Sequence, residues 1–182
     1  MVENKIIKVV GISGSLRKAS TNTAAIKYAA SLLPADRFSF EVLNYNDFPV
    51  YNGDIEEQVI PECVKRLHAE IMGADAVIIG CPEYNYSVSG ALKNMLDWVS
   101  RVKGGLFDKK PIAIIGCAAG PSGGSRATYE LRKTMIFFNG LILNKEVHIS
   151  ANYLKFDKEL KLTDEATQKA ITNQMTAFAD WI

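Results

Sequence analysis

A cluster of anion-binding side chains occupies residues 13–23. It combines Arg17 with a set of neutral donors: Ser13, Ser15, Ser20, Asn22 and Thr23. The cluster follows an apolar run at 6–12 and precedes an alanine-rich helical pattern. Backbone N–H groups and the positive end of the dipole favour an anion at a helix start, and an arginine fork suits phosphate oxygens. These residues therefore predict a site for a phosphate monoester on a small cofactor.

Spacing excludes three better-known phosphate loops. Counting from Gly11 places Leu16 where the Walker pattern needs its second glycine, and Gly-x-Gly-x-x-Gly is absent. None of the three cysteines has arginine six positions later, which excludes a Cys-x5-Arg phosphatase loop. The loop thus has binding chemistry without a matched nucleophile, and an ordinary capped strand–helix turn remains an alternative.

Composition narrows the class of protein. The 182 residues fit one domain, 1–182, with 48% hydrophobic residues. Lys and Arg total 21 against 20 Asp and Glu, and their scatter argues against nucleic acid as a partner. The longest apolar run, 76–81, is far too short for a membrane span, and the first residues lack a signal-peptide pattern. Three cysteines fit a reducing cytoplasm, and two histidines without Cys-x-x-Cys predict no metal site.

Strand and helix patterns alternate along the chain. Periodicity predicts strands at 5–12, 38–43, 76–81, 111–116 and a fifth at 141–143 and 146–149, with a turn-rich stretch at 44–54. It predicts helices at 22–33, 61–73, 90–102, 125–139 and 164–181. This alternation predicts a doubly wound, three-layer α/β/α domain, in which ligands bind beyond the carboxyl ends of the strands. We therefore expect loops 13–23, 82–90 and 117–126 to meet.

The second and third of these loops are suited to a flat ring. Residues 82–90 offer a rigid proline, two aromatic side chains and an amide, and residues 117–126 are mostly small. Small residues allow a ring to approach the backbone closely. No Ser, His and Asp set suggests a catalytic triad.

Together the loops resemble the NADPH-dependent FMN reductase family of the flavodoxin-like superfamily, especially its quinone and chromate reductase branch. The matching segments are 14–22, 82–90 with 92–94 and Asp97-Trp98, and 123–126. The resemblance spans essentially the whole chain. It implies a flavodoxin-like parallel sheet of five strands in the order 2-1-3-4-5, bound FMN, and NADPH or NADH as substrate. It also implies two-electron, ping-pong hydride transfer to quinones, chromate, azo compounds or free flavin.

The resemblance also assigns site residues. Ser15, Arg17, Ser20, Asn22 and Thr23 would hold the FMN phosphate. The ring and ribityl side would lie along Pro82, Glu83, Tyr84 and Asn85, with Cys117 and Ala118 approaching the ring. Cys117 stands where relatives often have a hydroxyl residue, so we expect a small buried side chain there. No catalytic residue is assigned, and Glu83 is expected to be a solvated or salt-bridged carboxylate.

Two further expectations concern assembly and alternatives. The helix at 90–102 carries an apolar arc that includes Met95 and Trp98, which predicts a second subunit against it, unless the helix is simply buried. The resemblance implies a homodimer or homotetramer, with Arg101, Arg126 and Tyr129 near the contact.

A flavodoxin-like electron carrier without NAD(P)H activity is the main alternative function, but carriers tend to be acidic and this chain has net charge +1. A hydrolase or transferase that reuses the phosphate loop is the third.

Overall fold

A computed structural model describes residues 5–182. Its centre is a six-stranded parallel sheet in the order β2-β1-β3-β6-β7, with β8 also paired to β6. The strands are β1 (Ile7–Ser13), β2 (Phe38–Val42), β3 (Ala76–Cys81), β6 (Pro111–Cys117), β7 (Leu141–Ile142) and β8 (Val147–Ile149). The predicted strand order is confirmed, and the fifth strand is divided into β7 and β8.

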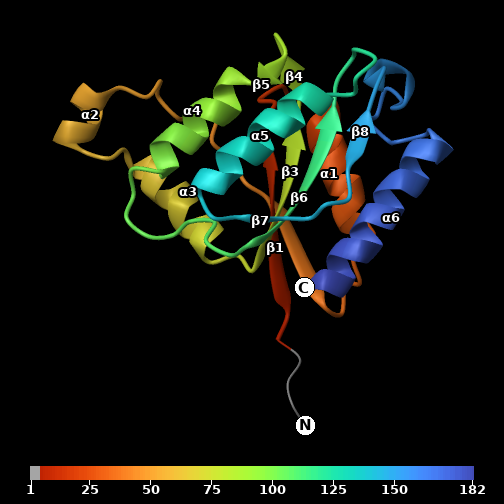
Figure 1. The fold of residues 1–182 in the computed structure, drawn as a ribbon, viewed down its shortest axis with the longest axis horizontal. Coiled ribbons are helices and arrows are strands. Elements are labelled where there is room, and N and C mark those ends of the chain that lie inside the picture. Colours follow the sequence, from red (N-terminus) through yellow and green to blue (C-terminus); the bar gives the residue numbers. More distant parts are fainter. Residues whose placement is uncertain (1–4) are drawn as a thin grey trace.

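Helices cover both faces of the sheet (Figure 1). Side chains of α3 (Glu62–Met72), α4 (Gly90–Val99) and α5 (Ser125–Phe137) form one core, and those of α1 (Thr21–Ser31) and α6 (Glu165–Trp181) form the other. Strand β3 is buried along its whole length because both of its faces are covered, as its uniformly apolar sequence predicts. The three-layer α/β/α class is therefore confirmed. None of the helices within residues 5–182 is long and apolar enough to cross a membrane.

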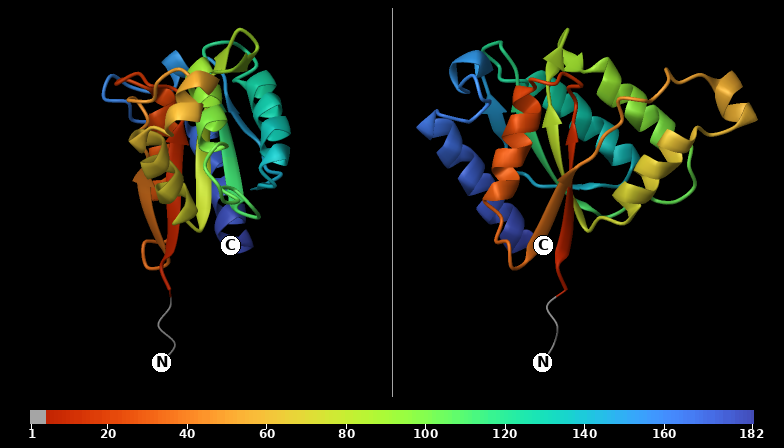
Figure 2. Two further views of the ribbon diagram at one scale, coloured as in Figure 1. Left: turned by 90° about the vertical axis from the view of Figure 1, so that its left-hand side faces the viewer. Right: turned by 180° about the vertical axis from the view of Figure 1, so that it is seen from behind.

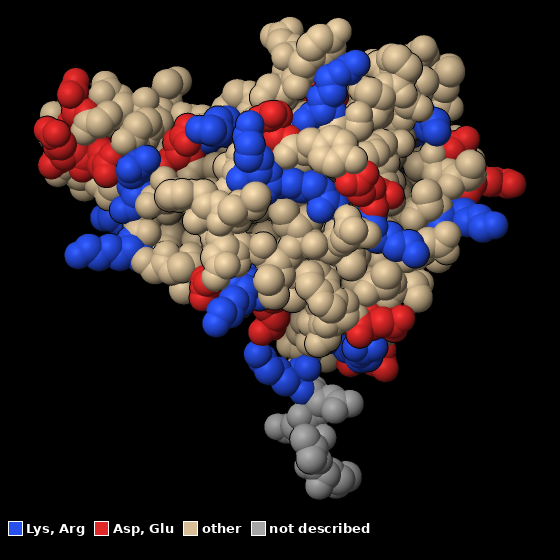
Figure 3. All heavy atoms as spheres, in the orientation of Figure 1, with Lys and Arg blue, Asp and Glu red and all other residues tan. Residues whose placement is uncertain are grey.

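Three elements were not predicted, and one of them is the short 3-10 helix Asn152–Leu154. Helix α2 (Gly53–Gln58) begins at the end of the stretch 44–54 that is expected to be turns, and it projects from the body in Figure 1 and in the right-hand view of Figure 2. It carries Asp54, Glu56 and Glu57 and forms the acidic end of the face in Figure 3, where charges of both signs otherwise intermix. The third element is an antiparallel hairpin of β4 (Glu83–Tyr84) and β5 (Ser87–Val88) within the 82–90 loop.

The apolar arc of α4 is buried inside the protomer. Met95 and Trp98 are each 0% exposed, and the indole N–H of Trp98 donates to the carbonyl oxygen of Pro49 at 2.9 Å. The segment around α2 covers this side of the helix, with Phe48 and Tyr51 packed against the same core. The interpretation that the arc faces another subunit is therefore wrong, and the buried-helix alternative is correct. The helix also ends at Val99 instead of residue 102.

Candidate functional site

The loops that follow β1, β3 and β6 meet at the carboxyl edge of the sheet, as expected. They enclose a cavity of about 320 Å³. Most of the predicted site residues line it, namely Ser15, Arg17, Ser20, Asn22, Pro82, Glu83, Tyr84, Cys117 and Ala118. Ser13 and Thr23 line a neighbouring cavity of about 190 Å³, and Asn85 lines neither. Thr21, Ala119 and Asn152 complete the first cavity, and sequence reasoning missed all three.

Close packing at Gly14 fixes the first loop against the second. The Gly14 N–H donates to the carbonyl oxygen of Gly80 at 2.7 Å. A Cβ at residue 14 would lie 2.6 Å from Cδ of Pro82, which is closer than real Cβ contacts allow. The Ser89 hydroxyl also donates to the carbonyl oxygen of Gly14. The phosphate-type loop therefore needs glycine here because it lies directly on the segment after β3.

Several hydroxyls of the first loop shape the turn itself. The Ser20 side chain caps α1 by accepting from the Thr23 N–H at 3.1 Å. The Thr23 hydroxyl donates to Oγ of Ser13 at 2.9 Å, and the buried Tyr45 hydroxyl donates to the carbonyl oxygen of Ser13 at 2.6 Å. Burial raises the pKa of Tyr45 above its ordinary value, so it stays a neutral donor. Ser13 and Thr23 thus hold the loop in shape.

Arg17 is a charged group that remains available in the cavity. It is exposed and lines both cavities beside the loop. Within residues 5–182 no carboxylate lies within salt-bridge distance of its guanidinium. An unpaired guanidinium beside the start of α1 can pair with a phosphate that enters the cavity.

Asn22 and Asn152 join the first loop to the strand end of β6. The Asn22 amide nitrogen donates to the carbonyl oxygen of Cys117 at 3.0 Å, and the Asn152 amide donates to Oγ1 of Thr21 at 2.8 Å. The Cys117 thiol lies 3.5 Å from the same hydroxyl, and burial raises the pKa of this thiol. It is therefore a neutral, buried strand-end residue, as expected. Asn152 reaches the site from the short 3-10 helix Asn152–Leu154.

Asn22 also presents an acceptor that the protein does not satisfy. Its side-chain oxygen is buried, and no donor in the described part of the chain bonds to it. Buried polar atoms in native proteins are usually paired, and the unpaired oxygen of Asn22 belongs to a side chain that lines the cavity, where a ligand group can bind. A ligand with hydroxyl groups would supply the missing donor.

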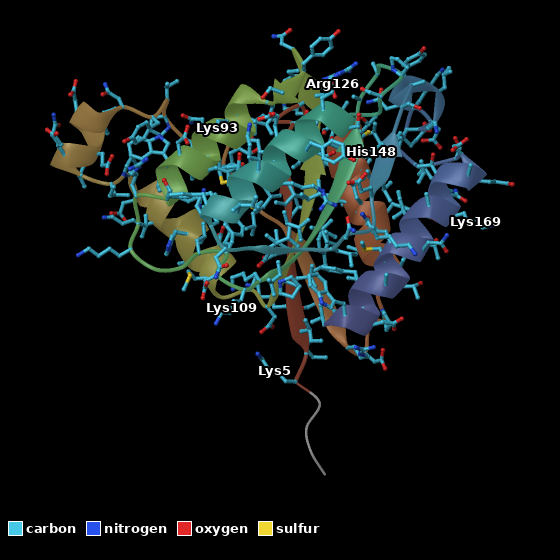
Figure 4. All side chains as sticks on the ribbon, in the orientation of Figure 1. Lys5, Lys93, Lys109, Arg126, His148 and Lys169 are labelled. Atoms are coloured by element: carbon cyan, nitrogen blue, oxygen red, sulfur yellow. The ribbon has the colours of Figure 1, made fainter. Side chains whose placement is uncertain are left out.

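The Glu83 carboxylate binds to the start of α5. It pairs with the Arg126 guanidinium at 2.9 Å and accepts from the Arg126 backbone N–H at 3.1 Å. The Arg126 guanidinium also lies 4.2 Å from the ring centroid of Tyr86 (Figure 4 labels Arg126). The expectation that Glu83 is a salt-bridged carboxylate is confirmed. These contacts fasten the β4–β5 hairpin to α5.

Asn85 forms the tip of the β4–β5 hairpin together with Tyr86. Asn85 and Tyr86 have φ of 51° and 66°, so both central residues of the turn are left-handed, as in a type I′ turn. Asparagine tolerates this conformation and tyrosine does not readily adopt it. The cation–π contact with Arg126 stabilises Tyr86 there. Asn85 therefore shapes the turn and lies outside the cavity.

The donor set of the site suits an organic anion better than a metal. Within residues 5–182 no three His, Cys, Asp or Glu side chains gather closely enough to hold a metal ion. The cavity offers a guanidinium and a helix start at one end and an unpaired acceptor at Asn22. Backbone segments 82–84 and 117–119 form its other side. A phosphate, a polyol chain and a flat ring would therefore each find complementary groups in the cavity.

Comparisons with known proteins agree with this chemistry. The family model described as NADPH-dependent FMN reductase matches residues 7–153. An NAD(P)H-dependent FMN reductase of Pseudomonas aeruginosa is 42% identical over 177 residues, with 97% of this chain and 95% of the relative covered. A quinone reductase of Escherichia coli is 35% identical over 179 residues, with 97% and 95% covered. The solved structure of a flavoenzyme NAD(P)H:(acceptor) oxidoreductase from Paracoccus denitrificans has a TM-score of 0.83 at 32% identity, with 97% of each chain covered.

Proposed function

This chain belongs to the NADPH-dependent FMN reductase family, and from that membership we propose that it is an FMN-dependent NAD(P)H oxidoreductase that reduces quinones. The cavity at the carboxyl edge is the observation that carries the proposal, because it gathers most of the residues predicted for FMN. The electron-carrier alternative is weaker, since relatives that align along nearly the whole chain are named as reductases.

We propose a role for each part of the cavity. Arg17 and the start of α1 hold the FMN phosphate, and the unpaired oxygen of Asn22 accepts a ribityl hydroxyl. Backbone groups of Pro82, Glu83 and Tyr84 and of residues 117–119 border the ring. Ser13 and Thr23 act indirectly by shaping the turn.

The protein contributes binding and orientation. FMN, when bound, supplies the hydride and two-electron chemistry. The carboxylate and the thiol beside the cavity are not free to transfer a proton: Glu83 is paired with Arg126, and burial raises the pKa of the Cys117 thiol and keeps it protonated. We therefore assign no general acid or base, and positioning of nicotinamide and acceptor on one exposed ring face is the main contribution of the chain.

Chromate, azo compounds and free flavin are further acceptors that such an open site would admit. We also propose self-association as a dimer or tetramer and a cytoplasmic location. Ile136 and Phe137 support self-association, because each is 76% exposed at the end of α5 and another subunit would cover this apolar surface.

Three free cysteines support the cytoplasmic location, since a reducing compartment preserves thiols.

Steady-state kinetics of the FMN-loaded protein test the proposed function. NADPH oxidation with benzoquinone should give parallel double-reciprocal lines and inhibition by excess quinone, because both substrates occupy one cavity in turn. Rapid mixing with NADPH alone should bleach the flavin absorbance without any acceptor. Intersecting lines would indicate two simultaneous sites. Tight FMN binding without NAD(P)H oxidation would favour the electron carrier instead.

A further inference from the structure

A second cavity of about 380 Å³ adjoins the proposed FMN site and plays no part in it so far. It lies between the first turns of α1 and the segment 159–162, which precedes α6. Figure 2 shows this segment beside one end of α1. Ser20 borders both cavities, so the two share a wall at the start of α1. A ligand long enough to occupy both would pass directly over this residue.

The far wall of this cavity is a preformed turn. Phe156 and Leu162 form an antiparallel bridge, and one carboxylate oxygen of Asp157 accepts from the backbone N–H groups of Glu159 (3.0 Å) and Lys161 (2.8 Å). Leu160 sits at the bend with φ of 63°. A turn held by these bonds keeps its position when a ligand binds, which lowers the ordering cost of binding.

Three lysines surround the cavity: Lys18, Lys27 and Lys161. Six other lysines form ion pairs, namely Lys5, Lys8, Lys65, Lys93, Lys133 and Lys155. None of the three at the cavity has a carboxylate within salt-bridge distance in the described part of the chain. Glu159 is the one acidic residue of the lining, so the cavity keeps a positive balance.

The floor between the lysines is largely apolar. The side chain of Tyr28 is partly buried and that of Leu162 is buried. Ala24 and Leu160 also line the cavity. Such a surface suits the flat face of a purine, while ammonium groups at the rim suit a phosphate. Adenosine that carries a 2′-phosphate combines both features, and it is the part of NADPH that NADH lacks.

We propose that this cavity binds the 2′-phosphorylated adenosine of NADPH and makes the protein prefer NADPH to NADH. The inference rests on the proposed function, because it needs the nicotinamide to lie over FMN in the adjoining cavity. Lys27 and Lys161 pair with the 2′-phosphate, and Tyr28 packs against the adenine. Glu159 opposes the phosphate and limits the preference.

Kinetics of the FMN-loaded protein with both nucleotides test the proposal. For Lys27→Gln combined with Lys161→Gln, the ratio of kcat/KM for NADPH to that for NADH should fall on the order of tenfold, through KM for NADPH. Glu159→Gln should raise the same ratio. Lys169→Gln is the matched control, because Lys169 is an exposed lysine on α6 outside the cavity (Figure 4) and should leave the ratio unchanged.

Calorimetry with adenosine 2′,5′-bisphosphate gives a test that needs no turnover. The wild-type holoprotein should bind it more tightly than adenosine 3′,5′-bisphosphate, and the double lysine variant should lose this difference. Equal binding of the two isomers, or an unchanged kinetic ratio in the double variant, would overturn the proposal and leave the proposed function intact. A wild-type protein that oxidises neither nucleotide would instead refute the proposed function.

Discussion

Replacing Glu83 by alanine removes the carboxylate that fastens the β4–β5 hairpin to the start of α5. The residue preceding α5, Gly124, has no side chain to cap the helix, so Glu83 supplies the acceptor from a distant strand. Its side chain is only 9% exposed, whereas that of Arg126 is 49% exposed. The perturbation should therefore weaken both the helix start and the attachment of the loop that borders the proposed FMN site.

The expected loss follows from the individual contacts. Loss of a helix-capping acceptor costs about 0.5–2 kcal/mol, and a half-exposed ion pair contributes up to about 1 kcal/mol. The Ser122 hydroxyl, 3.4 Å from the carboxylate oxygens, adds little. Glu83→Ala should therefore lower the free energy of unfolding by about 2 kcal/mol. Arg126→Ala should cost about 1 kcal/mol or less, because the carboxylate still accepts from the backbone N–H.

Urea denaturation of both variants and of Glu83→Gln measures these differences, and titration with FMN measures the effect on the cofactor. Glu83→Gln should retain an acceptor for the helix and keep kcat at saturating FMN, with the pH–rate profile unchanged. A stability of Glu83→Ala equal to that of wild type would refute the capping argument. A large loss of kcat in Glu83→Gln with an altered pH profile would show that Glu83 transfers a proton.

Three other changes have equally definite outcomes. Arg17→Ala should weaken FMN binding by about 1.5–3 kcal/mol and barely affect unfolding, because the side chain is exposed; equal wild-type affinity for riboflavin and FMN would contradict the phosphate role. Trp98→Asp should destabilise the protomer by at least about 3–5 kcal/mol in thermal melts, because the indole is 0% exposed, whereas a folded but dissociated variant would restore the interface interpretation. Burial lowers the pKa of His68, so its contribution to stability is present above the ordinary pKa of about 6.5 and is lost as pH falls below that value. The melting temperature of His68→Gln should accordingly depend less on pH between pH 5 and pH 7, and an identical dependence in both proteins would contradict this.

The strand order could be predicted because the sheet has a strong sequence signal. Strands β3 and β6 are apolar on both faces, which is typical of central parallel strands between two helical layers. The missed elements give almost no signal. Helix α2 has six residues, none of them buried, and the hairpin strands have two residues each. The turn Asn85-Tyr86 also lacks the glycine that usually marks a type I′ turn.

The candidate site was predictable where its residues are contiguous and unpredictable where they come from distant segments. Residues 13–23 predict an anion site because a strand, a set of hydrogen-bond donors and a helix start follow one another along the chain. Asn152 bonds to Thr21 across 131 positions, and Tyr45 bonds to Ser13 across 32. Neither stands in a motif, so only the fold reveals that one amide and one phenol fix the loop.

The error at α4 has a physical cause that extends to other helices. An apolar arc wider than one sheet contact shows that something covers the helix, but it does not show what. Here the cover is the chain's own segment 48–60, with Tyr51 packed edge-on against Trp98 at a centroid distance of 5.1 Å. The first part of that segment falls in the stretch 44–54, which the sequence predicts as turns. Self-association needs apolar side chains that stay exposed after the protomer folds. Ile136 and Phe137 at the end of α5 stay exposed, whereas Met95 and Trp98 are buried.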